Sequence, residues 1–213
     1  MADTDDKANG KRIILGRGYK TMTVLDIMAI GILERNEEGK VTKADSTSAL
    51  VRTKNRIILV DPSTEYLWPM VRTSFVQLKI RPADVDTVIL THAHRDHTEN
   101  LGRFPKAEVY IHDDEEIDIP GAVRVKGEEH RLEPDVLLVH TPGHTRGSMS
   151  VFVDAELRYA IAGDAIPTKN NFVKMVPPAS NYDEGLALES IKKIRRYADV
   201  IIPGHGLPFP TRI

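Results

Sequence analysis

The chain has 213 residues, of which 41% are hydrophobic and 28% charged, a composition ordinary for a globular protein with a sizeable core. Its formal net charge of −2 provides no general attraction for nucleic acid or for an anionic membrane. The lack of cysteine excludes disulfides, thiolate-bound metals and a cysteine nucleophile, so any metal site must use His, Asp and Glu.

The amino-terminal segment is polar and carries no apolar stretch of the kind found in secretory signals. We expect residues 1–10 to be disordered and residues 11–213 to form a single domain. No window of about 18 consecutive apolar residues predicts a membrane span. We therefore expect a cytoplasmic protein that does not bind a membrane.

The first half of the chain alternates short apolar segments with turns and closes with a helix. Residues 12–16 and 23–33 are rich in β-branched side chains and predict strands, and a turn follows at residues 37–40. Residues 46–62 predict a hairpin of two strands. Apolar residues every three or four positions predict a helix over residues 64–80.

The second half is dominated by short strands. A strand is predicted over residues 86–92, a short helix over residues 97–104, and a clearly amphipathic helix over residues 182–198. Further strands are predicted over residues 107–112, 121–127, 135–142, 148–154, 157–164 and 199–206. Many strands with few helices indicate an α/β (α+β) fold layered as helix, sheet, sheet and helix.

Candidate metal ligands follow four of the predicted strands, where each strand gives way to a loop. They are His92, His94, Asp96 and His97 in the first loop, and then His144, Asp164 and His205. Loops at one end of a rigid sheet scaffold are the usual place for catalytic groups. The pattern therefore predicts a site at one edge of the sheets.

These seven side chains suit a pair of divalent cations. Imidazole and carboxylate bind Zn²⁺ at about 2.0–2.2 Å. Two ions about 3.5–4 Å apart need roughly three ligands each and a shared bridge. A set of nitrogen and oxygen ligands without thiolate favours zinc and is also compatible with Fe or Mn²⁺. We therefore predict a dinuclear metal centre.

The chain resembles the metallo-β-lactamase superfamily from about residue 46 to residue 208. The segment "HAHRDH" matches the HxHxDH motif of that family, and "TPGHTRGS", "AGD" and "PGHG" are similar to its later motifs. The resemblance implies a four-layer αββα sandwich with metals at one edge of the two sheets. The chain length and the short carboxyl-terminal segment look most like the compact single-domain members, including the metallo-β-lactamase-domain-containing protein 1 group.

The resemblance also implies a role for each ligand. It assigns His92, His94 and His144 to a first metal, Asp96, His97 and His205 to a second, and Asp164 to a bridge between them. It makes Asp61 a supporting acceptor for a ligating imidazole. The chain has Asp-Pro-Ser at residues 61–63 where the family has Asp-Thr-Gly, so Asp61 could instead initiate a turn.

This site predicts a metallo-hydrolase. A water that bridges two cations loses a proton readily, and the resulting hydroxide would attack a carbonyl or phosphoryl centre. The metals would stabilise the developing oxyanion, and the resemblance suggests that Asp96 also shuttles a proton to the leaving group. We expect the substrate to be a small molecule with an ester, thioester or lactone bond.

Two alternatives remain open at this point. The same centre could serve a phosphodiesterase or nuclease acting on RNA or DNA, aided by basic residues near the motif loops. These basic residues are Arg95, Arg103, Arg146, Lys169 and Lys174. A non-catalytic metal-binding or interaction module is disfavoured, because all seven ligands are intact.

The loop at residues 170–182 follows Asp164 and is apolar and proline-containing, so we expect it to overhang the metals. Phe172, Met175 and Tyr182 are its predicted substrate contacts. The acidic run at residues 112–118 is expected to be a solvated loop. The sequence does not fix the oligomeric state, and a homodimer is left open.

Overall fold

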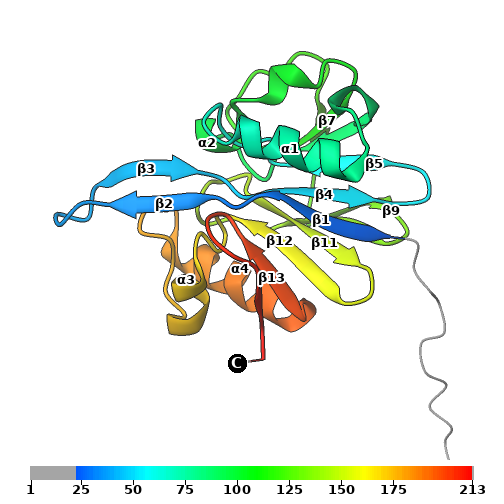
Figure 1. The fold of residues 1–213 in the computed structure, drawn as a ribbon. Helices are drawn as coiled ribbons and strands as arrows, with labels where there is room; N and C mark the ends of the chain where they lie inside the picture. Colours follow the sequence, from blue (N-terminus) through cyan, green and yellow to red (C-terminus); the bar gives the residue numbers. More distant parts are fainter. Residues whose placement is uncertain (1–22, 213) are drawn as a thin grey trace, which may run out of the picture.

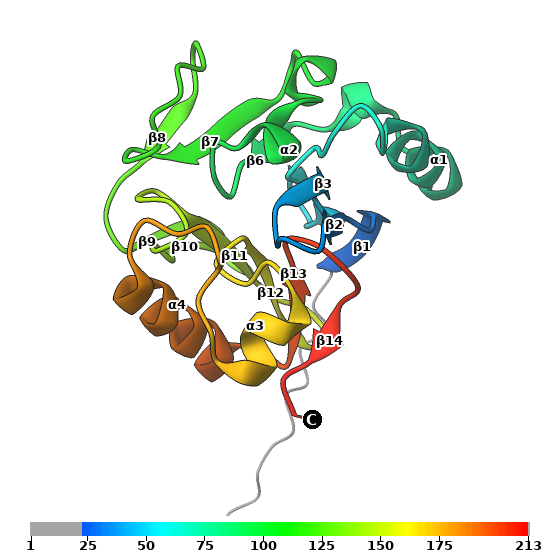
Figure 2. The same ribbon diagram turned by 90° about the vertical axis from the view of Figure 1, so that its left-hand side faces the viewer.

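The structure, a computed structural model, describes residues 23–212, so the predictions for residues 1–10 and 12–16 lie outside the described residues. Two six-stranded sheets face one another (Figure 1). Helices cover the outer face of each sheet (Figure 2). This arrangement is the four-layer αββα sandwich that the sequence predicts.

The first sheet combines an antiparallel half with a parallel half. Its strands, in spatial order, are β1 (Val24–Ala29), β4 (Ser48–Arg52), β5 (Ile57–Val60), β6 (Thr87–Ile89), β7 (Glu108–His112) and β8 (Val123–Val125). Strands β5 to β8 run parallel to one another. Their carboxyl ends therefore meet at a single edge of the sheet, which is where "HAHRDH" begins.

The second sheet presents its own loops at the same edge. Its strands, in spatial order, are β14 (Phe209–Pro210), β13 (Val200–Pro203), β12 (Arg158–Gly163), β11 (Met149–Asp154), β10 (Val136–His140) and β9 (Glu129–Glu133). Strands β12 and β13 are parallel, whereas the other neighbouring strands are antiparallel. The loops after β10, β12 and β13 carry the remaining three histidine and aspartate motifs.

A separate hairpin projects from the sandwich and consists of β2 (Ile32–Arg35) and β3 (Val41–Asp45) (Figure 1). The sequence predicted one strand over residues 23–33, but the chain breaks at Gly31. A Cβ atom at Gly31 would lie 2.2 Å from the Asp45 carbonyl oxygen and 2.4 Å from the Thr47 nitrogen. Only glycine permits this close approach, which redirects the chain from the sheet into the hairpin.

Three apolar layers hold the sandwich together. Side chains between the sheets come from both of them, for example Val51, Ile58 and Val151. Helix α1 (Trp68–Leu78) packs Val71 and Phe75 against the outer face of the first sheet. Helix α4 (Glu184–Tyr197) packs Ile191 and Ile194 against the second. Both helices form where periodic apolar residues predict them.

The shorter elements are those that the sequence predicted least well. Helix α2 (Arg95–Thr98) and the 3₁₀ turn Leu101–Arg103 share the region predicted as one short helix. Strands β3, β9 and β14, helix α3 (Lys169–Lys174) and the 3₁₀ turn Pro82–Asp84 were not predicted. Within residues 23–212, no helix combines the length and the apolar character needed to cross a membrane.

Candidate metal centre

All seven predicted ligands meet at the shared edge of the two sheets. His92 and His94 lie in the loop after β6, and Asp96 and His97 lie on α2. His144, Asp164 and His205 follow β10, β12 and β13. The seven residues fall into three overlapping groups in which the ligand atoms lie within 4.8 Å of one another. Segments far apart in the sequence thus build one compact site.

The first group consists of His92, His94 and His144. The ring planes of these histidines meet at 78° to 88°, so their in-plane lone pairs can point at a common position. The Nδ1–H group of His144 donates to the carbonyl oxygen of Ser180 at 2.7 Å, which leaves Nε2 with a free lone pair. This Nε2 lies 3.0 Å from Nδ1 of His94. The three rings are arranged as ligands of one ion.

The second group consists of Asp96, His97 and His205. Nδ1–H of His205 donates to the carbonyl oxygen of Asp45 at 2.8 Å, which turns its Nε2 atom toward the site. Nε2 of His97 and Nε2 of His205 each lie 3.7 Å from Oδ2 of Asp96. These three atoms lie close enough together to hold a cation.

Asp164 lies between the two groups. Its Oδ1 atom is 3.6 Å from Nε2 of His97 and 3.3 Å from Nε2 of His205. Its Oδ2 atom is 3.5 Å from Nε2 of His144. A Cβ atom at Gly204 would lie 2.0 Å from Oδ1, so this carboxylate needs the glycine of "PGHG". One oxygen faces each group, as a bridging ligand requires.

Asp61 supports the second group by binding the ring nitrogen of His97 that faces away from the site. Its carboxylate is buried and accepts hydrogen bonds from the backbone N–H of Thr91 at 2.8 Å and from the Thr91 hydroxyl at 2.7 Å. It also accepts the Nδ1–H of His97 at 2.7 Å. This bond fixes the His97 tautomer and presents its Nε2 atom to the site, which is the geometry that the supporting role needs.

The Asp-Pro-Ser sequence of residues 61–63 has serine where the family pattern has glycine. Ser63 adopts a φ of 63°, in the left-handed region that favours glycine. Its hydroxyl donates to the carbonyl oxygen of Ser46 at 2.7 Å, and its carbonyl oxygen accepts the backbone N–H of Asn100 at 3.2 Å. These bonds hold a strained residue in place, and Asp61 keeps its hydrogen bond to His97 beside it.

Burial and neighbouring charges set the protonation of the site. Burial keeps the pKa of His92 well below its usual value. Burial alone would lower the pKa of His97, but the Asp61 and Asp164 carboxylates outweigh it and raise that pKa well above its usual value. Burial would raise the pKa of Asp164, but the neighbouring imidazoles of His205 and His97 hold it well below its usual value. His97 and His205 of the second group are therefore strongly coupled to the Asp164 carboxylate.

The donor set fits divalent cations. Nε2 of His92, Nε2 of His97 and Oδ1 of Asp164 are buried without a hydrogen-bond partner among residues 23–212. Buried polar atoms are normally satisfied, and these three converge on one place. His92 belongs to the first group, His97 to the second, and Asp164 lies between them, so one cation in each group would satisfy all three atoms. The nitrogen and oxygen ligands suit zinc, iron or manganese.

A further cluster of His112, Asp114 and His140 does not have ligand geometry. The two imidazole rings are stacked 4.0 Å apart with only 6° between their planes. Parallel rings share no in-plane point at which both could bind one ion. Nδ1 of His112 already accepts the backbone N–H of Asp114 at 3.2 Å. The stack therefore serves as a contact between β7 and β10.

A cavity of about 160 Å³ opens onto the metal centre. Besides His94, Asp96, His144, Asp164 and His205, its lining residues are Leu33, Arg35, Val41 and Ala44 of the hairpin, together with Pro167, Pro178, Ala179 and Ser180. The hairpin wall was not anticipated, because no motif marks it. Apart from the candidate metal ligands, the cavity is lined mainly by apolar residues, with one cation supplied by Arg35.

The three residues predicted as substrate contacts do not line the cavity. Phe172 is buried and packs against Phe209, with ring centroids 5.5 Å apart. Met175 ends α3 and packs against the same core. Tyr182 is exposed beneath the Arg146 guanidinium, 4.6 Å from the ring centroid. Helix α3 turns the start of the loop inward, so that Pro178, Ala179 and Ser180 reach the cavity instead.

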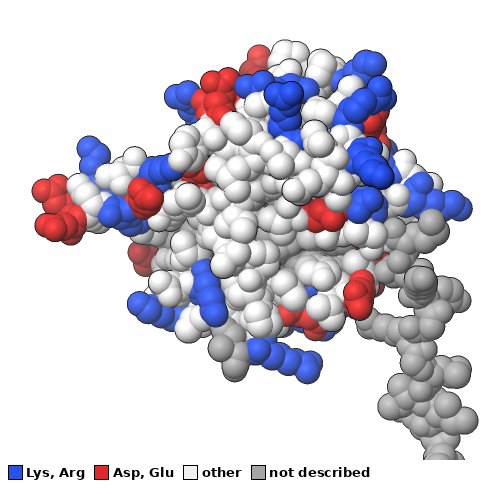
Figure 3. Space-filling view, in the orientation of Figure 1, with Lys and Arg blue, Asp and Glu red and all other residues white. Residues whose placement is uncertain are grey.

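The basic residues around the site are partly neutralised. Arg95 is paired with Glu99, and Arg103 is bonded to Glu65 at 3.2 Å while lying over the ring of Trp68. On the face shown in Figure 3, basic and acidic side chains are interspersed around a largely uncharged middle. This face therefore has no continuous positive field for a nucleic-acid backbone.

Comparisons with known proteins show which family this chain resembles. The family model described as "Metallo-beta-lactamase superfamily" matches residues 41–113. The probable metallo-hydrolase of Methanocaldococcus jannaschii is 40% identical over 89% of this chain and 91% of its own length. The metallo-beta-lactamase domain-containing protein 1 of Xenopus laevis is 32% identical over 80% of this chain and 75% of its own length.

A solved structure shares the fold. The crystal structure of a quorum-quenching N-acyl homoserine lactone lactonase superposes with a TM-score of 0.68. The superposition covers 88% of this chain and 93% of the lactonase chain, at 22% sequence identity. The sequence relatives, the αββα sandwich and the assembled ligand motifs all lead to the same conclusion: this chain belongs to the metallo-β-lactamase superfamily.

Proposed function

We propose that this metallo-hydrolase holds two divalent cations, with Zn²⁺ as the expected metal, and hydrolyses an ester, thioester or lactone bond of a small molecule. The observation that carries the proposal is the position of Asp164. One of its oxygens faces the His92, His94 and His144 group and the other faces the His97 and His205 side. Two ligand groups joined by a bridging carboxylate are the arrangement that a dinuclear hydrolase needs.

Each side chain has a defined task in this reaction. His92, His94 and His144 would hold the first cation, Asp96, His97 and His205 the second, and Asp164 both. Bound there, the pair would supply a hydroxide nucleophile and stabilise the developing oxyanion. Asp61 keeps the Nε2 atom of His97 directed at the site.

Asp96 is the carboxylate placed to move a proton. Its side chain is 21% exposed, whereas that of Asp164 is 10% exposed, and it lines the cavity from the start of α2. A carboxylate at the border between ligands and cavity can pass a proton to the leaving group. We therefore assign Asp96 both a ligand role and an acid role.

The cavity favours a small and partly apolar substrate. Its volume of about 160 Å³ is limited by the apolar side chains of Leu33, Val41 and Pro178. An acyl group with a cyclic or linear ester fits such walls better than a polyanionic chain does. That a lactonase has the same fold supports a lactone as one substrate class.

The test is a hydrolysis panel on protein of measured metal content. The panel contains an aliphatic ester, a thioester, an N-acyl lactone, a β-lactam, a phosphodiester and single-stranded RNA. We expect turnover of at least one of the first three, its loss on chelation and its return with Zn²⁺. Activity on the phosphodiester and RNA alone would overturn the substrate class in favour of a nuclease.

Asp96→Asn tests the acid role within the same panel. We expect turnover to fall by about 10²- to 10⁴-fold, the usual contribution of a positioned acid or base. Asp118→Asn is the matched control, because this carboxylate is exposed in the acidic run. Unchanged turnover of Asp96→Asn with metal retained would remove the acid role.

A further inference from the structure

The acidic run at residues 112–118 contains one carboxylate that is not solvated. Glu115 is only 4% exposed, whereas Asp113, Asp114 and Glu116 around it are exposed. The charge pattern predicted a solvated loop, and for Glu115 this prediction is wrong. A carboxylate leaves water only when other groups replace its hydration.

Two loops supply the hydrogen bonds of Glu115. Its Oε2 atom accepts the backbone N–H of Ala93 at 2.8 Å, and its Oε1 atom accepts the hydroxyl of Thr145. Ala93 lies between His92 and His94, and Thr145 directly follows His144. A single carboxylate thus ties together the two loops that carry the whole first ligand group.

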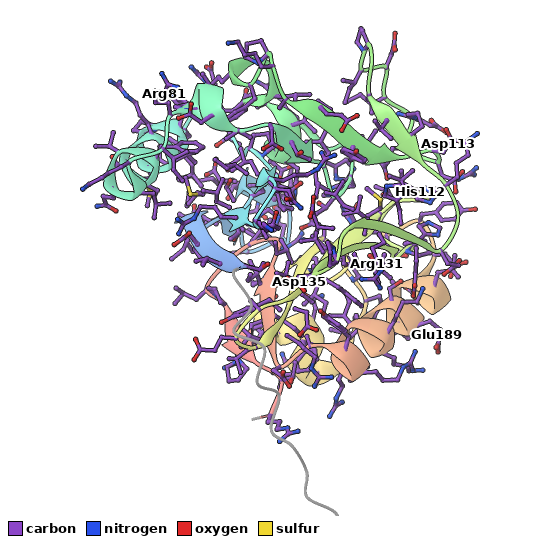
Figure 4. The ribbon with its side chains drawn as sticks, turned by 90° about the vertical axis from the view of Figure 1, so that its right-hand side faces the viewer. Arg81, His112, Asp113, Arg131, Asp135 and Glu189 are labelled. Carbon is purple, nitrogen blue, oxygen red and sulfur yellow. The ribbon has the colours of Figure 1, made fainter. Side chains whose placement is uncertain are left out.

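The turn that carries Glu115 is itself firmly held. The Arg124 guanidinium on β8 donates to the carbonyl oxygens of Asp113, Glu115 and Ile117 at 3.1, 2.6 and 3.1 Å. His112, directly before the turn, lies at the end of β7 in the space between the two sheets (Figure 4). There it stacks on His140 of β10. Glu115 therefore projects from a base that is fixed to both sheets.

Gly147 packs closely against the Glu115 side chain. A Cβ atom at Gly147 would lie 2.7 Å from both Cγ and the backbone nitrogen of Glu115. The glycine of "TRGS" therefore provides the space in which this side chain fits. The hydroxyl of Thr145 is held in addition by the Ser148 hydroxyl at 2.6 Å. Both ends of the connection are ordered.

We infer that Glu115 is a positioning residue that sets the spacing between the two histidine loops, so that His92, His94 and His144 form a ready site for the first metal. The inference rests on the metal centre proposed above. Three rings from two sheets must agree within about 0.5 Å and 10–20° to bind one ion well. The backbone bond from Met149 N–H to the Thr91 carbonyl oxygen, at 2.7 Å, also joins these regions. Loss of Glu115 should therefore loosen the site without dismantling it.

The experiment measures Zn²⁺ binding by competition with a chromophoric chelator, on the whole chain and its variants. For Glu115→Ala we expect affinity for one of the two ions to fall by about 10- to 100-fold, the range seen when outer groups that orient ligands are removed. Affinity for the other ion should stay at the wild-type value. Glu116→Ala is the matched control and should bind both ions as the wild type does, because its side chain is exposed.

Glu115→Gln distinguishes positioning from simple loss of fold. The glutamine oxygen can still accept the Ala93 N–H, and its amide can donate to the Thr145 hydroxyl, so most of the affinity should return. Thr145→Val removes one of the two bonds from the opposite side and should weaken the same ion. This variant also keeps the test decisive if Glu115→Ala fails to fold.

The outcomes separate this inference from the proposed function. If the wild type binds no Zn²⁺, both fail. If the wild type binds two ions and Glu115→Ala binds them with equal affinity, only the positioning role is refuted. Equal weakening of both ions, with no rescue by Glu115→Gln, would also overturn it, because this result indicates a general loss of structure.

Discussion

Asp61→Asn tests how the second ligand group is held in place. The substitution keeps the size of the side chain but leaves one acceptor oxygen where the carboxylate has two. The carboxylate accepts bonds from the Thr91 backbone, the Thr91 hydroxyl and His97. Asparagine must turn its amide N–H₂ group toward either the Thr91 N–H or the His97 Nδ1–H. One buried donor then stays unpaired, which costs about 1–3 kcal/mol.

The same substitution should also weaken metal binding. Without a carboxylate on Nδ1, the His97 ring loses its fixed tautomer, and changes of this kind cost about 10- to 100-fold in metal affinity. We expect one Zn²⁺ to bind more weakly by this factor in a competition titration. Urea unfolding of the metal-free chain should show the stability loss.

Asp26→Asn is the matched control, because its carboxylate pairs with Arg52 at 2.8 Å on β1 and β4, which lie outside the metal centre. It should leave Zn²⁺ binding unchanged. Wild-type Zn²⁺ affinity in a folded Asp61→Asn chain would refute the assignment of Asp61 as the support of His97.

Three further predictions concern Gly204 beside Asp164, the pH dependence of Zn²⁺ affinity and the pH dependence of fold stability. Gly204→Ala should displace the Asp164 carboxylate, because the new Cβ would lie 2.0 Å from its Oδ1 atom. Metal analysis should show fewer ions per chain than for the control Gly206→Ala, which introduces backbone strain at a φ of 108° but no contact with Asp164. Equal metal content in the two variants would contradict the bridging role of Asp164. Zn²⁺ affinity should fall as the pH is lowered, because the raised pKa of His97 lets a proton compete with the metal for Nε2. A Zn²⁺ affinity that does not change with pH in chelator titrations would count against this. Hydrogen bonds from Arg158 lower the pKa of Asp199 from 3.8 to about 2, so this pair should stabilise the fold above pH 3.8 and lose its effect as the pH falls through 2. At about one-third exposure the pair contributes at most ~1 kcal/mol, and Asp199→Asn should remove that part of the acid sensitivity in urea unfolding; an unchanged pH profile would argue against it.

The sequence predicts which histidine and aspartate side chains meet, because they lie in local motifs in the segments that follow strands. Strand ends fix where a side chain emerges, and parallel strands bring distant ends to the same edge. His92 and His205 are 113 positions apart in the sequence, yet both loops leave the same edge of the sandwich. The local sequence pattern was therefore sufficient to predict which side chains meet in the folded chain.

The walls of the cavity could not be predicted in this way. Phe172 is apolar and close to Asp164 in the sequence, but α3 turns it into the core of the second sheet. Leu33 and Val41 come from a hairpin that exists because Gly31 breaks a strand. Contacts of this kind depend on packing between elements, for which hydrophobic periodicity gives no signal.

Glu115 shows the same limit for a charged residue. Its neighbours in the acidic run are solvated, and nothing in the run marks one member as buried. Its position depends on Ala93, Thr145 and Arg124, which lie in three other segments. Only the assembled structure indicates which carboxylate joins the histidine loops.

The position of Asp164 predicts that its carboxylate bridges two metal ions. Anomalous diffraction from crystals grown with Zn²⁺ tests it most directly, together with metal analysis of the same protein. We predict two peaks, one among His92, His94 and His144 and one among Asp96, His97 and His205, with an Asp164 oxygen directed at each. A single peak, no peak, or an ion bound at the His112 and His140 stack instead would contradict the assignment of Asp164 as a bridging ligand.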